Sequence, residues 1–108
     1  MGTLIGLWLG WLAATAPVPA GAPARAELVV VDGLGPTSLE TFDCVATPRS
    51  SEVARVCHDA ARGLVLAEVN GRMRAWCEVD AGLVRDWLAA PSMGRFLAER
   101  VAPAHRCD

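Results

Sequence analysis

The chain has 108 residues, with 10 basic and 12 acidic side chains and a formal net charge of −2 at pH 7. This length fits one small domain. Affinity for nucleic acid comes mainly from cations that neutralise phosphates, so the acidic balance argues against DNA or RNA as the general partner.

Residues 1–26 have the layout of a secretory signal peptide. Thr3 to Ala16 is an uncharged apolar run, and a segment rich in proline leads from it to Ala24-Arg25-Ala26. An apolar run followed by an Ala-x-Ala triplet is typical of a cleaved signal. The run is shorter than the roughly 20 apolar residues that a spanning helix needs. We therefore predict a secreted or periplasmic protein; an uncleaved membrane anchor and a cytosolic leader are the alternatives.

Four cysteines follow this leader, and none lies within it. They are Cys44, Cys57, Cys77 and Cys107, without a Cys-x-x-Cys pair. An even number of cysteines in a small exported chain favours two disulfides, with three possible connectivities. The spacing does not indicate a zinc site, and we expect no metal and no cofactor. Four buried free thiols are the alternative.

The segment 27–49 is predicted to be a strand and loop extension ahead of the main domain. Glu27 to Val31 is a short strand-like run, and Asp32 to Pro36 ends it with turn-forming residues. Thr37 to Ser51 has no clear period and contains Pro48. We expect a loop there, tied down through Cys44.

The next elements are a strand over Val53 to His58 and a β-hairpin. The hairpin joins Leu64–Val69 to Arg72–Val79 through Asn70-Gly71. This dipeptide between two apolar runs favours a type I′ turn, because both central positions need positive φ.

A two-residue turn also fixes which hairpin side chains share a face. It places Arg72, Arg74 and Trp76 opposite three apolar residues of the preceding strand. The alternate face is more apolar throughout, and we expect it to be the main core side. Its members are Leu64, Leu66, Met73, Ala75, Cys77 and Val79. Arg72, Arg74 and Trp76 then lie on the more open side.

Two short helices are predicted after the hairpin. Asp80 can cap the first, which ends at Pro91, and Ser92 can cap the second, which Pro103 stops. Both carry an apolar stripe that can cover a sheet face. We therefore predict an α+β domain, namely a small antiparallel β-meander of about three strands covered on one face by two C-terminal helices.

Residues 50–108 also carry a set of short motifs. Ser50 and Ser51 precede an aliphatic strand, the Asn-Gly hairpin follows, and the clearest pattern is Ala90, Ser92, Gly94, Arg95 and Phe96. In these motifs the chain resembles the KTSC domain, a small domain found alone in bacteria and at the C-terminus of some lysyl-tRNA synthetases. Where that family has Tyr-x-Tyr, this chain has Arg74-Ala75-Trp76. The resemblance implies a fold and no established reaction.

Together these features favour an exported, non-catalytic KTSC-like binding module. Its partner is expected to be a protein or a cell-envelope component, with membrane contact only if the leader stays uncleaved. The candidate binding residues are Arg72, Arg74, Trp76 and Arg95, although Arg95 could instead pair with Glu99. The alternative is a cytosolic RNA-binding module in which Trp76 stacks on bases.

A catalytic role is not expected from the sequence. Ser50, Ser51, His58 and Asp59 include the residue types of a nucleophilic triad, but no nucleophile elbow accompanies them. Cys57 and His58 are adjacent on a predicted strand and would point to opposite faces, so they are a poor thiolate and base pair.

Overall fold

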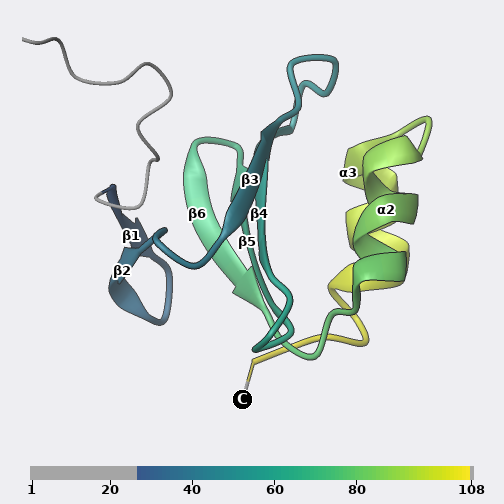
Figure 1. The fold of residues 1–108 in the computed structure, drawn as a ribbon. Helices are drawn as coiled ribbons and strands as arrows, with labels where there is room; N and C mark the ends of the chain where they lie inside the picture. The colour runs from purple at the N-terminus through teal and green to yellow at the C-terminus, as the bar shows by residue number, and fades with distance from the viewer. Residues whose placement is uncertain (1–26, 108) are drawn as a thin grey trace, which may run out of the picture.

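A computed structural model describes residues 27–107 of the chain, and the predicted signal peptide lies outside them. Hairpin β1–β2, strands β3 to β6, and the helices follow one another across the molecule (Figure 1). The strands are β1 (Leu28–Val31), β2 (Gly35–Ser38), β3 (Asp43–Ala46), β4 (Val53–Asp59), β5 (Leu64–Val69) and β6 (Arg72–Trp76). The helices are α2 (Ala81–Ala89) and α3 (Met93–Phe96), and α3 continues as a π-helical turn over Leu97–Val101.

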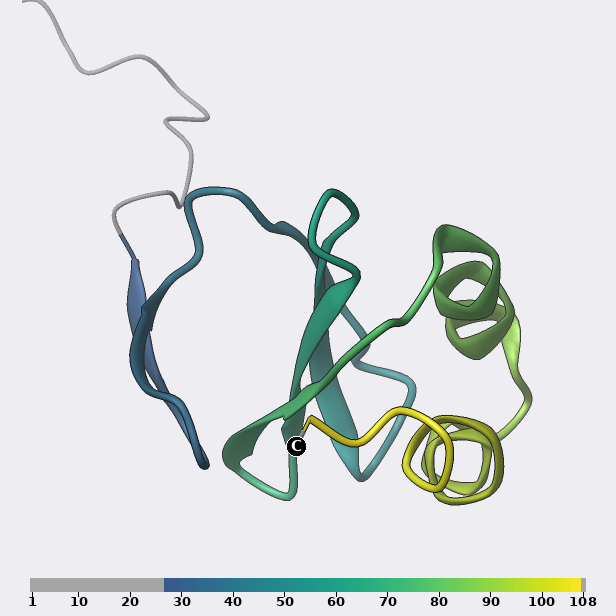
Figure 2. The same cartoon turned by 90° about the horizontal axis from the view of Figure 1, so that it is seen from below.

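The six strands form one mixed sheet in the order β2-β1-β6-β5-β4-β3. Neighbours are antiparallel except β1 and β6, which meet in parallel at Val31 and Met73. The chain passes directly from β2 at one edge to β3 at the other. The sheet therefore curls into a half-barrel, with β1–β2 facing the central strands (Figure 2).

The predicted three-strand meander is thus wrong. Strands β4, β5 and β6 are neighbours, but three strands from the N-terminal extension join them in the same sheet. Both β2 and β3 lie within or beside the segment that we expected to be a loop. Their sequences, Gly-Pro-Thr-Ser and Asp-Cys-Val-Ala, have no apolar alternation, and all four residues of β3 are exposed. Pairing with β1 and β4 makes them strands, which local propensity cannot reveal.

The β5–β6 hairpin has the predicted register and turn. Val65 lies opposite Trp76, Ala67 opposite Arg74, and Val69 opposite Arg72. Asn70 and Gly71 have φ values of 50° and 82°, as a type I′ turn requires.

The two faces of this hairpin are covered differently from the prediction. The helices pack on the face that bears Trp76, where Trp76 meets Trp87 edge-on with ring centroids 6.2 Å apart. Trp76 is only 3% exposed. The opposite face, with Leu66 and Met73, lines the inside of the half-barrel and packs against β1 and the β2–β3 connection. We expected one covered face, and the structure has two cores because the N-terminal segment covers the second.

Both helix caps are as predicted. The Asp80 carboxylate accepts from the backbone N–H of Leu83 at 2.7 Å, and the Ser92 hydroxyl accepts from that of Arg95 at 3.2 Å. Trp87 is fully buried and donates its indole N–H to the Met93 carbonyl at 3.0 Å, which ties α2 to the start of α3.

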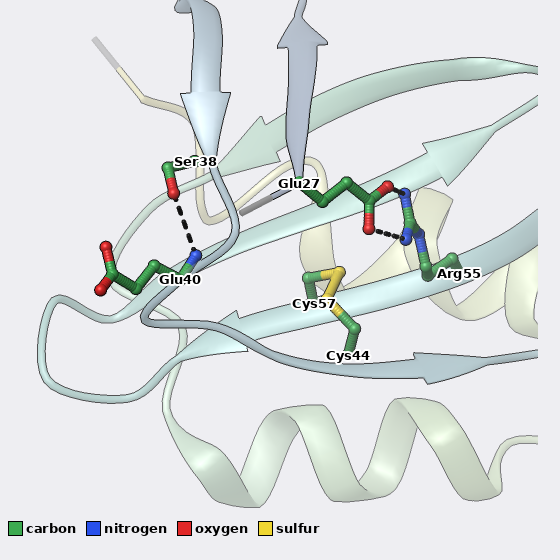
Figure 3. The surroundings of a disulfide bond; sticks show 6 residues. All are labelled: Glu27, Ser38, Glu40, Cys44, Arg55 and Cys57. Carbon is green, nitrogen blue, oxygen red and sulfur yellow. Dashed lines mark hydrogen bonds and ion pairs between the residues drawn. A yellow bond between two sulfur atoms is a disulfide. The ribbon is translucent and has the colours of Figure 1, made fainter. Parts of the chain in front are cut away.

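The cysteines form two disulfides, Cys44–Cys57 and Cys77–Cys107. The first joins directly opposite residues of β3 and β4, and near it a bidentate ion pair links Glu27 to Arg55 at 3.0 and 3.2 Å (Figure 3). This ion pair lowers the pKa of Glu27 and raises that of Arg55, since each charge is stabilised by the other.

Two disulfides indicate an oxidising, extracytoplasmic environment. None of the helices in the described part of the chain is long and apolar enough to span a membrane.

Candidate functional site

A groove of about 360 Å³ runs beside the second half of β6. One wall is the β1–β2 turn, residues 32–34, and the other is the C-terminal segment, with Ala102, Arg106 and Cys107. Residues 74–76 of β6 lie between them. We call this surface the β6 groove.

The groove exists because two segments that are far apart in sequence flank the same strand. Parallel pairing of β1 with β6 brings the β1–β2 turn to one side, where the Asp32 N–H donates to the Met73 carbonyl at 2.9 Å. On the other side, Cys77–Cys107 holds the C-terminal segment in place. The Cys77 N–H also donates to the His105 carbonyl at 2.7 Å.

Of the predicted binding residues, Arg74 and Trp76 line the groove. The Arg74 guanidinium lies over the Trp76 ring, 5.4 Å from its centroid. This stacking gives the guanidinium a preferred direction while leaving Arg74 exposed. Arg74 forms no ion pair with any other described residue.

Arg72 also lies on β6, but its charge is already engaged. Its Nε is 3.0 Å from an Asp32 carboxylate oxygen, and the two side chains are 73% and 43% exposed. Arg72 therefore neutralises the acidic residue at the rim of the groove rather than adding a free cation.

Arg95 lies apart from this strand, on α3. It is exposed, and the expected ion pair with Glu99 is not among those formed by the described residues. The structure thus groups Arg72, Arg74 and Trp76, and it does not bring Arg95 to them.

Sequence reasoning missed Arg106, a second exposed cation that lines the groove. It lies in a segment without helical or strand periodicity, after Pro103. Its neighbour Cys107 was the available signal, because a disulfide to Cys77 places the residue before it beside the end of β6.

The burial of Trp76 bears on base stacking. A stacking platform needs an accessible ring face, whereas this indole is covered by Trp87 on one side and approached by Arg74 on another. Phe42 and Trp87 are buried as well. An exposed stacking platform built on these rings would require the core to open.

Ser50, His58 and Asp59, which have the residue types of a nucleophilic triad, each bond to groups outside that set. Ser50 Oγ accepts from the Val53 N–H at 3.0 Å, and His58 Nε2 lies 3.0 Å from the Val79 carbonyl. Asp59 is buried and accepts from Thr41 Oγ1 at 2.6 Å and from Arg62 Nε at 2.7 Å. These bonds, the Thr41 bond foremost, lower the pKa of Asp59 to about 2. Cys57 is in a disulfide and offers no thiolate.

A second, smaller hollow of about 170 Å³ lies between the β3–β4 loop and the start of α3. Residues from two of the motifs that resemble the KTSC domain line this hollow. They are Ser50 and Ser51 from the first motif, and Ser92 and Gly94 from the other. A Cβ on Gly94 would lie 2.5 Å from a Glu52 carboxylate oxygen. Gly94 therefore lets the exposed Glu52 side chain approach the start of α3 closely.

No group of three or more potential metal ligands occurs among residues 27–107. No family model matches the sequence, and no curated protein is found to be similar to it. The KTSC resemblance therefore rests on the short motifs alone.

Proposed function

We propose that this protein is an exported binding module with no chemistry of its own, and that the β6 groove is its ligand-binding surface. Its partner is a protein or a cell-envelope component. The motifs shared with KTSC domains support the module assignment, and the two disulfides support a working place outside the cytoplasm.

One observation carries the proposal. Arg74 is held over Trp76 in a defined direction, is exposed, and has no ion-pair partner among residues 27–107. An oriented but unpaired arginine in a groove contributes little to folding, whereas it is pre-organised to bind a ligand.

Export is tested by the intact mass of the protein recovered from its native compartment. We expect a chain that begins at Glu27 and is lighter by four hydrogens than the fully reduced form, because cleavage follows Ala26 and both disulfides are present. A chain that begins at Met1 and carries four free thiols would overturn the proposal of an exported module.

A further inference from the structure

The charged side chains that line the β6 groove leave it with an excess of positive charge. Its lining contains Arg74, Arg106 and Asp32, and Asp32 is held by Arg72 at 3.0 Å. Neither Arg74 nor Arg106 forms an ion pair with another described residue. A chain with net negative charge thus places in one hollow two guanidinium groups that have no ion-pair partner among residues 27–107. This arrangement favours an anionic ligand.

The rest of the groove is apolar or small. Leu34, in the β1–β2 turn, is 50% exposed. Ala102 lies across from it in the opposite wall. A ligand body placed between these two side chains would remove apolar surface from water.

We infer that the β6 groove binds a small ligand that joins a carboxylate or phosphate group to an apolar body. The oxyanion lies against Arg74 and Arg106, while the apolar body covers Leu34 and Ala102. Guanidinium groups suit this task, because their planar forks bond oxyanions in a bidentate manner. The inference rests on the proposed binding function and narrows the partner from a protein or a cell-envelope component to a small component of the cell envelope. The hollow of about 360 Å³ is within the size range of small-molecule sites.

The test uses the oxidised, processed protein and two pairs of probes followed by NMR. N-acetylphenylalanine is compared with its amide, and phenyl phosphate with phenol, so that each pair differs in the anion. We expect both anions to shift the Trp76 indole N–H resonance with saturable curves, and the two neutral probes to bind at least tenfold more weakly. Comparison of the two anions tells a carboxylate site from a phosphate site.

Variants complete the experiment. Arg74→Gln and Arg106→Gln should each weaken binding of the preferred anion at least tenfold. Arg85→Gln is the matched control, since Arg85 is an exposed arginine on α2 and does not line the groove. Unfolding midpoints of all three variants show whether each is folded.

Absence of saturable binding by either anion would overturn the inference. So would equal binding of anion and neutral probe, or equal losses in Arg85→Gln and the groove variants. These results are independent of the intact mass. Export with oxidised cysteines but no anion binding would refute the ligand class while leaving the proposed export intact.

Discussion

At the scale of single residues, Asp59 has the most complete set of partners around a carboxylate. It ends β4, yet its bonds reach Thr41 in the β2–β3 connection and Arg62 in the following turn. Arg62 also lies over the Phe42 ring, 5.3 Å from its centroid. Asp59 therefore fixes the segment that closes the inner core, and its charge has a structural purpose.

The lowered pKa of Asp59 predicts a specific loss of stability in acid. The pKa is about 2 in the folded protein against an ordinary 3.8, so the folded state favours the charged form. The stability from this charge is present above about pH 4 and is lost as the pH falls toward 2. Urea unfolding between pH 7 and pH 2.5 measures it.

The matched variants for this effect are Asp59→Asn and Asp43→Asn. Asp43 is exposed and has no ion pair within the described residues. We expect Asp59→Asn to be less stable at pH 7 and to lose less stability than the wild type between pH 4 and 2.5. If the stability of Asp59→Asn and that of the wild type depended equally on pH, the Asp59 carboxylate would not be the cause of the loss of stability in acid.

The sequence was enough to single out Arg74 and Trp76 as candidate site residues, but it was not enough to predict how deeply each is buried. Arg74 and Trp76 were singled out because they replace two tyrosines of the family motif, and they do line the β6 groove. Their surroundings were not predictable, since the burial of Trp76 depends on Trp87, which follows it in a different element. Arg106 has no pattern around it and depends on a disulfide for its place.

At the scale of elements, Trp87 is the largest side chain by which helix α2 packs on the sheet. Trp87 is fully buried, packs edge-on against Trp76, and is the link from α2 to the Met93 carbonyl. We expect Trp87→Ala to lower the free energy of unfolding by about 3 to 5 kcal/mol, as large-to-small changes in a core do. Chemical denaturation gives this value directly.

Arg74→Ala serves as the comparison for that prediction. It removes a cation over the other tryptophan of the pair without opening the core, and it should cost under about 1 kcal/mol. If Arg74→Ala destabilised the protein as much as Trp87→Ala, then Arg74 would be a structural residue, and its proposed role in binding would lose its support.

Elements with strong local signals could be predicted, and those made by distant pairing could not. Asn70-Gly71 fixed the turn and register of β5–β6, and the two caps fixed the helix starts. The edge strands β2 and β3 have exposed or half-buried residues that are mostly polar or small, so their sequences look like loops. The error about the hairpin faces followed from this, because the unpredicted strands belong to the segment that covers the second face.

At the scale of the whole molecule, the segment from Glu27 to Ala46 is part of the fold and more than an extension. It contributes three of the six strands, and Val31, Leu39 and Phe42 complete the inner core. The Glu27–Arg55 ion pair and the Cys44–Cys57 disulfide both connect it to β4. A chain begun at residue 50 would lack all of these contacts and leave Leu66 and Met73 uncovered.

Removal of each of the two disulfides is expected to have a different effect on the molecule. They close sequence separations of 13 and 30 residues, so loop entropy alone gives stabilisations of about 2.9 kcal/mol for Cys44–Cys57 and about 3.6 kcal/mol for Cys77–Cys107. The two disulfides differ more in the segments that they hold in place than in these energies. Cys44–Cys57 joins two strands that also share backbone hydrogen bonds, whereas Cys77–Cys107 holds the segment that carries Arg106.

We therefore expect the double variant Cys77→Ala/Cys107→Ala to lose most of its affinity for the anionic probe under conditions where it is still folded. The double variant Cys44→Ala/Cys57→Ala should keep that affinity despite a similar loss of stability. Urea midpoints and NMR titration of both double variants measure the two effects separately. Equal affinity in both would mean that the backbone bond between Cys77 and His105 suffices to place the C-terminal wall. In that case the disulfide would stabilise the fold without shaping the β6 groove.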